Sequence, residues 1–261
     1  MSQPSSSRAF QVEQARVEIY PSNSELGKAA ALRASVILQA AIAKFGHARL
    51  IMATGNSQAD LVASLVQTRE VDWLRVEVFH MDEYIALPET HPGCLRRWMN
   101  TKFVNVVHPG KVNYLDGNAT DLEEECRRYE DLLRAAPIDL CLLGIGENGH
   151  IAFNDPHVAD FQDPLGVKRV DLDERDRRQQ AGEGHFPHYS DVPREAVTVT
   201  CPLLMSSKNL ICCVPELRKA EAVKNALEEP ISTRCPGSVV RTHPHACIYL
   251  DTDSASLLHN K

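Results

Sequence analysis

The sequence lacks an excess of positive charge. Its 261 residues include 28 Lys and Arg against 35 Asp and Glu, which gives a net charge of −7. A general nucleic-acid binder needs a basic face, so this acidic balance argues against that class. A small anionic substrate is not excluded, because a few local cations and backbone amides can hold a phosphate. We therefore expect a small-molecule ligand and no nucleic-acid partner.

The sequence also lacks a Cys-x-x-Cys pair, a signal peptide and a long apolar run. No apolar stretch approaches the ~20 residues that a membrane helix needs, and the polar, Ser-rich start predicts a disordered tail over residues 1–15. We expect a cytoplasmic protein without a membrane partner. Reduced core thiols are then favoured over a zinc site or disulfides for the eight cysteines, Cys94, Cys126, Cys141, Cys201, Cys212, Cys213, Cys235 and Cys247.

No internal repeat and no long linker divides the rest of the chain, so residues 16–261 are expected to form one domain. Apolar or β-branched runs predict strands at 17–20, 49–53, 75–80, 139–145, 196–200, 209–214 and 245–250. Helical spacing predicts helices at 22–45, 57–67, 93–104, 120–136 and 216–227. Apolar strands that alternate with helices are typical of a single-domain α/β fold, with a mostly parallel, Rossmann-like sheet and helices on both faces.

The segment 157–195 interrupts this alternation, because it is rich in Asp, Arg, Gln, Gly and Pro and has weak periodicity. Such excursions often serve as lids or binding loops. In open α/β sheets ligands bind beyond the carboxyl ends of the strands. We therefore expect the strand ends at 53–57, 80–84 and 144–150 to converge on one site.

A Gly-rich turn follows the predicted strand 139–145. The stretch GIGENG at 144–149 matches the dinucleotide pattern G-x-G-x-x-G, but that pattern needs a helix that opens at once, and the following Pro156 argues against one. The glycines instead favour a sharp turn that brings the backbone close to a ligand. A structural role is the common one for a single histidine, but His150 has Asp155 within reach. A carboxylate on one ring nitrogen would fix the tautomer and leave the other for substrate.

A pair of carboxylates follows the predicted strand 75–80. Asp82 and Glu83 could belong to a solvated turn. If they are partly buried, however, the second carboxylate raises the pKa of the first, which suits a group that abstracts a proton.

A turn of small polar residues follows the predicted strand 49–53, in the stretch ATGNSQADL at 53–61. Its amides and the hydroxyls of Thr54 and Ser57 could hold a phosphate at the start of the next helix. A simple helix cap by Asn56 or Ser57 is the alternative.

The stretches ATGNS (53–57), MDEYIALPETHP (81–92) and GIGENGHIAFNDP (144–156) resemble, in this order, the motifs of the glucosamine-6-phosphate deaminase (isomerase) family. That family shares its fold with the 6-phosphogluconolactonases, and the resemblance covers roughly residues 45–250. Lactonases typically carry Asp-Glu-Arg at 82–84 and Gly-His-Thr-Ala-Ser at 149–153, so these motifs favour the deaminase form. The stretch QQAGEGHFP after residue 178 indicates a divergent branch.

The resemblance implies hydrolytic deamination with aldose–ketose isomerisation, in which glucosamine 6-phosphate and water give fructose 6-phosphate and ammonia, without a metal or organic cofactor. It implies that Asp82 moves the C2 proton to C1 through an enol intermediate. It also implies that His150 assists ring opening, with Asn148 and Asp155 orienting it or completing a relay. The implied substrate-binding residues are Thr54, Gly55, Asn56, Ser57, Glu83, Gly149 and Lys219, the last of which helps to hold the phosphate.

Three positions depart from the family pattern. Asp155 stands where Glu is usual, and Asn148 stands where some members have Asp. An arginine that many members place before a Val-Pro pair has no clean counterpart; Gln180 falls nearest by spacing, and Arg177 or Arg178 could substitute.

Two other functions stay open at the level of sequence. One is a lactonase-type hydrolase on 6-phosphogluconolactone, against which residues 82–84 and 149–154 speak. The other is a non-catalytic sugar-phosphate-binding protein, like the effector domains of some bacterial regulators. Those regulators carry an N-terminal helix-turn-helix, for which residues 1–15 leave no room. Formation of a homo-oligomer also stays open.

Overall fold

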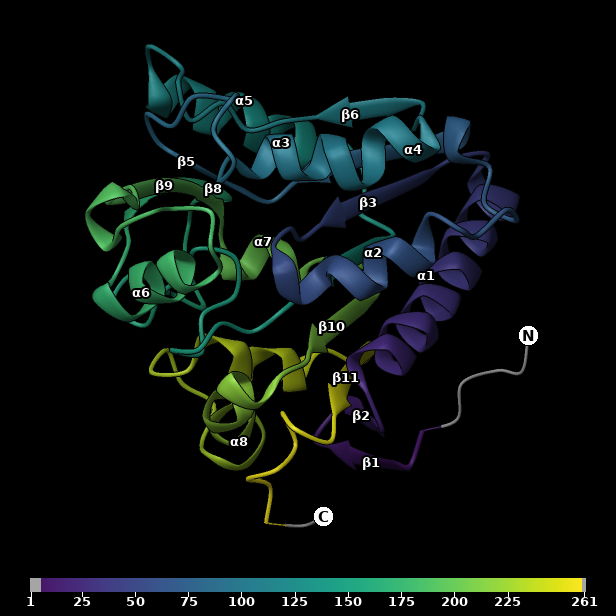
Figure 1. Cartoon of the computed structure of the whole chain (residues 1–261). Helices are drawn as coiled ribbons and strands as arrows, with labels where there is room; N and C mark the ends of the chain where they lie inside the picture. The colour runs from purple at the N-terminus through teal and green to yellow at the C-terminus, as the bar shows by residue number, and fades with distance from the viewer. Residues whose placement is uncertain (1–5, 260–261) are drawn as a thin grey trace.

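The computed structural model describes residues 6–259, and strands and helices alternate along most of the chain (Figure 1). Its central layer is an eight-stranded sheet in the order β1-β2-β11-β10-β7-β3-β4-β6. The strands are β1 (Arg8–Val12), β2 (Ala15–Tyr20), β3 (Ala48–Met52), β4 (Val76–His80), β6 (Lys111–Asn113), β7 (Leu140–Leu143), β10 (Leu210–Val214) and β11 (Ala246–Asp251). All neighbouring pairs are parallel except β1 with β2. The predicted α/β class with a mostly parallel sheet is confirmed.

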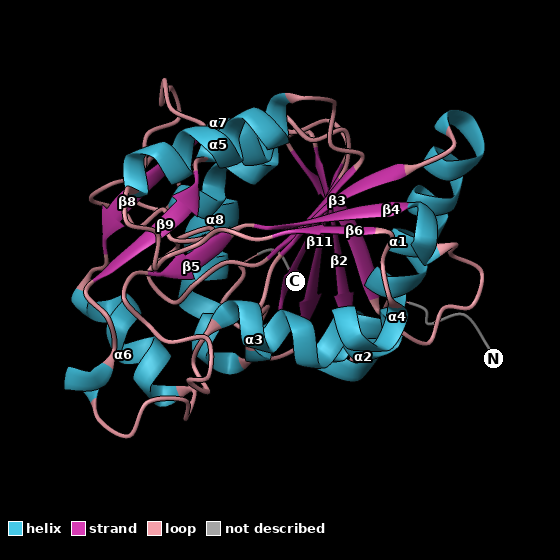
Figure 2. Cartoon of the chain, turned by 90° about the horizontal axis from the view of Figure 1, so that it is seen from above, coloured by secondary structure: helices cyan, strands magenta, loops and turns pink. Residues whose placement is uncertain are grey.

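Helices cover both faces of this sheet (Figure 2). They are α1 (Asn23–Phe45), α2 (Ala59–Leu65), α3 (Leu95–Met99), α4 (Asn105–Val107), α5 (Leu122–Arg134), α6 (Glu174–Gly182), α7 (Cys201–Met205) and α8 (Ala220–Glu228). A π-helical turn at Asn100–Val104 joins α3 to α4.

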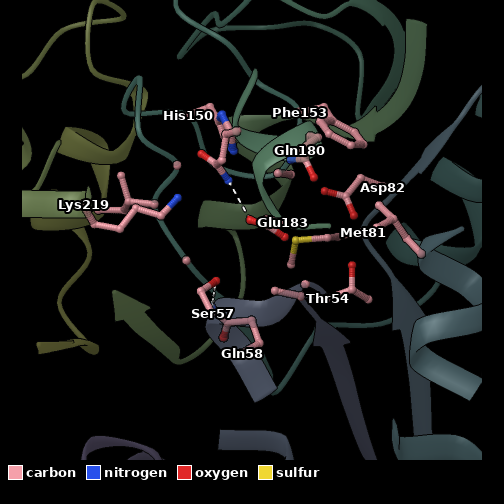
Figure 3. Close-up of a pocket in the computed structure, with 18 residues that line it drawn as sticks. Thr54, Ser57, Gln58, Met81, Asp82, His150, Phe153, Gln180, Glu183 and Lys219 are labelled. Carbon is pink, nitrogen blue, oxygen red and sulfur yellow. Dashed lines mark hydrogen bonds between the residues drawn. The ribbon is translucent and has the colours of Figure 1, made fainter. Parts of the chain in front are cut away.

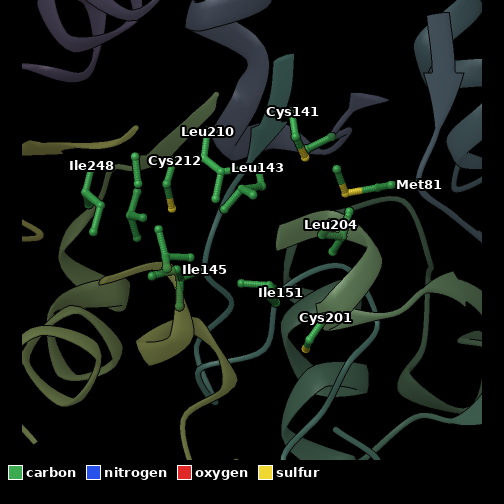
Figure 4. Packing of buried hydrophobic residues seen from close by; sticks show 14 of the residues in the cluster. Met81, Cys141, Leu143, Ile145, Ile151, Cys201, Leu204, Leu210, Cys212 and Ile248 are labelled. Atoms are coloured by element: carbon green, nitrogen blue, oxygen red, sulfur yellow. The ribbon is translucent and has the colours of Figure 1, made fainter. Parts of the chain in front are cut away.

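Strand side chains alternate between the two faces, because successive residues of a strand point in opposite directions. On β7, Leu140 and Leu142 pack in the cluster that contains residues of α1, α2 and α3. Cys141 and Leu143 pack on the other face, with residues of α5, α7 and α8. Figure 4 shows part of the second cluster around Leu143. This two-sided burial explains why the strand is apolar throughout.

The predicted strand 196–200 does not join the main sheet. It forms β9 (Glu195–Val199) of a separate antiparallel sheet, between β5 (Asp82–Tyr84) and β8 (Val167–Asp171). The register pairs Asp82 with Thr198. The chain therefore leaves the main sheet directly after β4, and β5 places Asp82 at the boundary between the two sheets.

The excursion 157–195 contains β8, α6, a 3₁₀ turn at Tyr189–Asp191 and the start of β9. It is anchored by Phe186, which stacks on His91 with ring centroids 5.0 Å apart and meets the edge of Tyr84 at 5.7 Å. Burying such an aromatic side chain is worth roughly 1.5–3 kcal/mol. The contact holds the α6 region beside the loop that follows β5.

The predicted disordered tail over residues 1–15 is wrong for Arg8–Val12, which form β1. Residues 1–5 lie outside the described residues. β1 pairs with β2 from Arg8↔Ile19 to Val12↔Ala15, and Phe10 and Val12 pack against the core. This hairpin pairing and the apolar contact order a segment whose composition alone reads as polar.

Helix α1 is long and apolar enough, by length and composition, to cross a membrane, contrary to the prediction that no apolar run reaches that length. Half of its apolar stretch is buried inside the fold. Leu26, Ala30 and Leu38 pack in the core with strands of the sheet. Its apolar character therefore serves the packing of the sheet.

All eight cysteines lie within the part of the chain that the structure describes, and each is a free thiol. Seven are buried and Cys247 is partly buried. Cys212 and Cys213, for example, point to opposite faces of β10 and belong to the two opposite core clusters. The predicted core thiols are confirmed.

Candidate active site

The three predicted strand ends converge on one pocket (Figure 3). It lies beyond the carboxyl ends of β3, β4 and β7, as expected for an open parallel sheet. Its polar lining comes from these strand ends, from α6 and from the residue before α8: Thr54, Ser57, Gln58, Asp82, His150, Gln179, Gln180, Glu183 and Lys219.

Asp82 is a nearly buried carboxylate in this lining, with 7% of its surface exposed. Its Oδ1 atom is buried and has no hydrogen-bond partner among the described residues. Burial, and then the neighbouring Glu83, raises the pKa of Asp82 to about 8, although His150 acts in the opposite direction. A carboxylate with a pKa near neutral pH can both take up and release a proton during turnover.

The Glu83 side chain has a structural role. Its carboxylate accepts hydrogen bonds from the backbone N–H groups of Tyr84, Leu95 and Arg96. It also accepts one from the thiol of Cys94, and it does not line the pocket. The implied contact of Glu83 with substrate is not supported by this geometry; Glu83 ties β5 to the start of α3.

His150 lies opposite Asp82, with 8% of its surface exposed. Its Nδ1 atom is 3.2 Å from Asp155 Oδ1 and 3.7 Å from Asp176 Oδ1. Burial alone lowers the pKa of the imidazole, but the carboxylates of Asp176 and Asp155 outweigh burial and raise it to about 9. The two carboxylates therefore favour the protonated, imidazolium form of His150.

The Gly-rich turn gives room to this imidazole. A Cβ atom on Gly146 would lie 2.2–2.5 Å from three atoms of the His150 ring. Gly149 has φ +89°. Its backbone N–H donates to Gly146 and its carbonyl accepts from Gly237, and Gly149 does not line the pocket. Gly146 thus leaves space for the His150 ring, and Gly144 and Gly146 also line the pocket, in agreement with a backbone that can approach a ligand closely.

Asn148 and Asp155 form the support behind His150. The Asn148 side-chain amide donates to Asp155 Oδ1 and to Asp173 Oδ2, both at 2.7 Å, and its oxygen accepts from the backbone of His150 at 3.1 Å. Asp155 is fully buried, and its Oδ2 accepts from the backbone of Asp173 at 3.0 Å. Burial raises the pKa of Asp155, but His150 and Asn148 hold it below its usual range.

The turn after β3 contributes Thr54, Gly55 and Ser57 to the pocket, and Gly55 has φ +95°. The Asn56 side chain turns away and donates to the backbone carbonyl of Glu183 at 3.1 Å. Neither Asn56 nor Ser57 caps the helix that follows, since no side-chain capping bond is formed there. The simple cap is therefore wrong, and the Ser57 hydroxyl remains directed to the pocket.

Lys219 extends into the same pocket from the start of α8 and has 2% of its surface exposed. Burial, and then the neighbouring Arg218, lowers its pKa to about 8. Glu183 points toward the same space. Its Oε1 atom accepts from Gln179 at 3.3 Å and from Arg218 at 3.4 Å, which partly neutralises the carboxylate.

No arginine lines the pocket in the part of the chain that the structure describes. Gln180 occupies the lining, as its spacing suggested. Arg177 is buried elsewhere and donates to the carbonyls of Val192 and Pro193, while the exposed Arg178 pairs with Glu174. Neither arginine can replace the missing one without a rearrangement of α6.

Sequence reasoning missed Asp176 and Gln179 of α6 and Glu183, the residue that follows the helix. One signal was present: Asp173 caps α6 by accepting from the backbone of Asp176 at 2.7 Å, which is the Asp-x-x-Asp pattern of a helix start. Side-chain atoms of the kinds that bind metals, on His150, Asp155 and Asp176, lie within 4.8 Å of one another. Both Asp155 oxygens already accept hydrogen bonds, so the arrangement fits a proton relay.

Fold and site together define an α/β protein that holds acid–base groups and a buried cation at the carboxyl edge of a parallel sheet. Residues 21–249 match the family model described as glucosamine-6-phosphate isomerases/6-phosphogluconolactonase. The chain belongs to this family.

Curated relatives and solved structures agree with the match. Glucosamine-6-phosphate deaminases of Bacillus cereus strain B4264 and Bacillus thuringiensis strain Al Hakam are each 38% identical over 207 residues, 79% of this chain and 76% of theirs. A structure described as a monomeric glucosamine-6-phosphate deaminase aligns with a TM-score of 0.85 at 32% identity, covering 92% of this chain and 99% of that one. The protein is therefore a glucosamine-6-phosphate deaminase-like enzyme.

The lactonase branch shares the fold. The 6-phosphogluconolactonase of Trypanosoma brucei aligns with a TM-score of 0.75 at 17% identity, covering 94% of this chain and 99% of that chain. At this identity the likeness shows the fold alone.

Proposed function

We propose that the enzyme converts glucosamine 6-phosphate, or a closely related amino-sugar phosphate, and water to the ketose phosphate and ammonia. One observation carries the proposal: Asp82, His150 and Lys219 extend into a single pocket from three different elements (Figure 3). They would supply a base for carbon, an acid–base group for oxygen and a cation for phosphate.

The substrate phosphate would bind between the turn after β3 and Lys219. The hydroxyls of Thr54 and Ser57 and the turn's amides donate to phosphate oxygens, and the ammonium adds a charge-assisted bond worth about 1.5–3 kcal/mol. Arg218 draws the Glu183 carboxylate toward itself, which limits its repulsion of the bound anion.

Ring opening would be the task of His150. The imidazolium gives its proton to the ring oxygen as the bond between C1 and that oxygen breaks, and the imidazole then takes the proton of the C1 hydroxyl. Asp155 stabilises the imidazolium from 3.2 Å. General acid–base help of this kind contributes about 10²–10⁴-fold.

Isomerisation would then use Asp82. Its carboxylate removes the proton from C2 of the open-chain sugar, which gives an enol, and returns the proton to C1. The product carries an imine at C2, which water hydrolyses to the ketone with loss of ammonia. The raised pKa of Asp82 makes its carboxylate a stronger base for a carbon-bound proton.

We propose that the enzyme works in the cytoplasm, where phosphorylated sugars are its substrates.

The test is ammonia release across a panel of hexosamine 6-phosphates, with Asp82→Asn as the inactive control. Release that requires Asp82 supports the proposal. Hydrolysis of 6-phosphogluconolactone without ammonia release would move the assignment to the lactonase branch. Saturable binding of the sugar phosphates without any turnover would instead identify a non-catalytic binding protein.

A further inference from the structure

His150 lies between two buried carboxylates that come from different parts of the chain. Asp155 belongs to the same loop, and Asp176 comes from the first turn of α6. Asp176 is 1% exposed and does not line the pocket. It therefore stands behind the imidazole, on the side away from substrate.

The loop of His150 supplies only one charge to the ring. Asn148 is neutral, and its amide is committed to Asp155 and Asp173. Asp155 in turn accepts hydrogen bonds on both oxygens, from Asn148 and from the backbone of Asp173. Asp155 therefore interacts with two other donors as well as with His150. As a result, it compensates the positive charge of the imidazolium only in part.

Asp176 can supply the remaining negative charge beside the imidazolium. Its Oδ1 atom accepts from Gln180 at 3.0 Å, and its backbone is held by the Asp173 cap. Its Oδ2 atom is buried without a hydrogen-bond partner among residues 6–259. A buried, half-satisfied carboxylate costs free energy. That cost is offset where the carboxylate lies 3.7 Å from a positively charged imidazole ring.

We propose that Asp176 is a positioning residue that forms a two-carboxylate relay with Asp155 on His150, and that it stabilises the imidazolium that exists while the sugar ring opens. The inference rests on the proposed function for the chemical step. The proton balance is unchanged: His150 gives one proton to the ring oxygen and takes one from the C1 hydroxyl, and Asp176 stays ionised.

The charged groups that face His150 come from four places. They are Asp155 on its own loop, Asp176 on α6, Asp82 on β5 and Lys219 before α8. Asp82 and Lys219 act from the pocket, where substrate also contacts the ring. Asp176 acts from behind, so its removal should change the proton affinity of His150 while leaving the substrate contacts in place.

The first measurement is the pKa of His150 by NMR titration of ¹⁵N-histidine-labelled protein, with the resonance assigned from His150→Gln. Asp176→Asn should lower this pKa by about one unit or more, because it removes a raising charge at short range. Asp176→Glu, which keeps the charge, should restore most of it. Glu174→Gln, which removes an exposed charge from the same helical turn, should leave it unchanged.

The second measurement is steady-state kinetics. Asp176→Asn should lower kcat on the cyclic sugar about tenfold or more, a share of the general acid–base contribution. KM should change little, and C2 exchange in an open-chain analogue should be less affected. Thermal unfolding should show little change in stability, since only one oxygen of the replaced carboxylate accepts a hydrogen bond.

An unchanged His150 pKa in folded Asp176→Asn would overturn the proposal. If that variant does not fold, Asp176→Ser removes the same charge with a smaller side chain and decides the same question. Because the titration needs no substrate, it tests the relay independently of ammonia release. A wild type that releases no ammonia would refute the proposed function, even where the pKa shift is found.

Discussion

Lys219→Met provides a test in which activity and stability should move in opposite directions. Lys219 is one of the largest fully buried side chains, and burial lowers its pKa from 10.5 to about 8. At 1.36 kcal/mol per pKa unit this drop corresponds to about 3 kcal/mol, by which the folded state disfavours the ammonium. Methionine has a similar length and no charge to desolvate. The substitution should therefore stabilise the fold by up to ~3 kcal/mol at pH 7.

The pH dependence of this gain has a defined sign. Below pH 8 the lysine is charged in both states, so the wild type bears the full penalty. As the pH rises from about 8 to 10.5, the folded lysine loses its proton while the unfolded one keeps it, and the penalty disappears. The stability advantage of Lys219→Met should therefore be complete at pH 7 and nearly absent at pH 10.5.

Urea unfolding at pH 7 and near pH 10 measures this difference. Ammonia-release kinetics should show KM raised roughly ten- to hundredfold, because the phosphate loses a charge-assisted bond. Lys224→Met, on the same helix α8, is the matched control and should change neither quantity substantially. A Lys219→Met protein that is less stable than wild type at pH 7 would refute the reasoning, and so would an unchanged KM.

Three further substitutions test the roles assigned in the pocket. Asp82→Asn should abolish C2 deuterium exchange in labelled water while phosphate binding persists; exchange at the wild-type rate would reassign the base. His150→Gln should slow the cyclic sugar about 10²–10⁴-fold and an open-chain analogue far less; equal losses would mean that His150 does not open the ring. Gly146→Ala should inactivate the folded enzyme, because its Cβ would overlap the His150 ring, and full activity would contradict the observed packing.

Local patterns in the sequence predicted most of the main sheet, because an apolar strand between two helical layers is determined by its own side chains. β7 is the clearest case: Leu140–Leu143 is buried on both faces and was expected from its composition. β9 was predicted as a strand, but its sheet was not. A short apolar run can pair in either sheet. β9 pairs with β5 because the chain leaves the main sheet after β4 and forms β5 in the second sheet.

The placement of Asp82 and His150, the proposed catalytic pair, was also within reach of sequence reasoning, since both side chains stand at strand ends that a parallel sheet brings to one edge. The resemblance to the family supplied their implied roles. The sequence could not show that Glu83 accepts hydrogen bonds from the backbone N–H groups at the start of α3 and so does not line the pocket. That contact depends on where α3 begins.

By itself, the sequence determined the apolar periodicity, the strand ends and the glycines, all of which act over a few neighbouring residues. Tertiary structure alone decided what the polar segment after residue 157 does. α6 has few apolar residues, and its position depends on the Asp173 cap, on Asn148 and on the anchored Phe186. Asp176 reaches His150 across 26 positions of the chain only because these contacts fold α6 over the pocket. Buried charge interacts through space, and no local pattern records which distant residue will come within 4 Å.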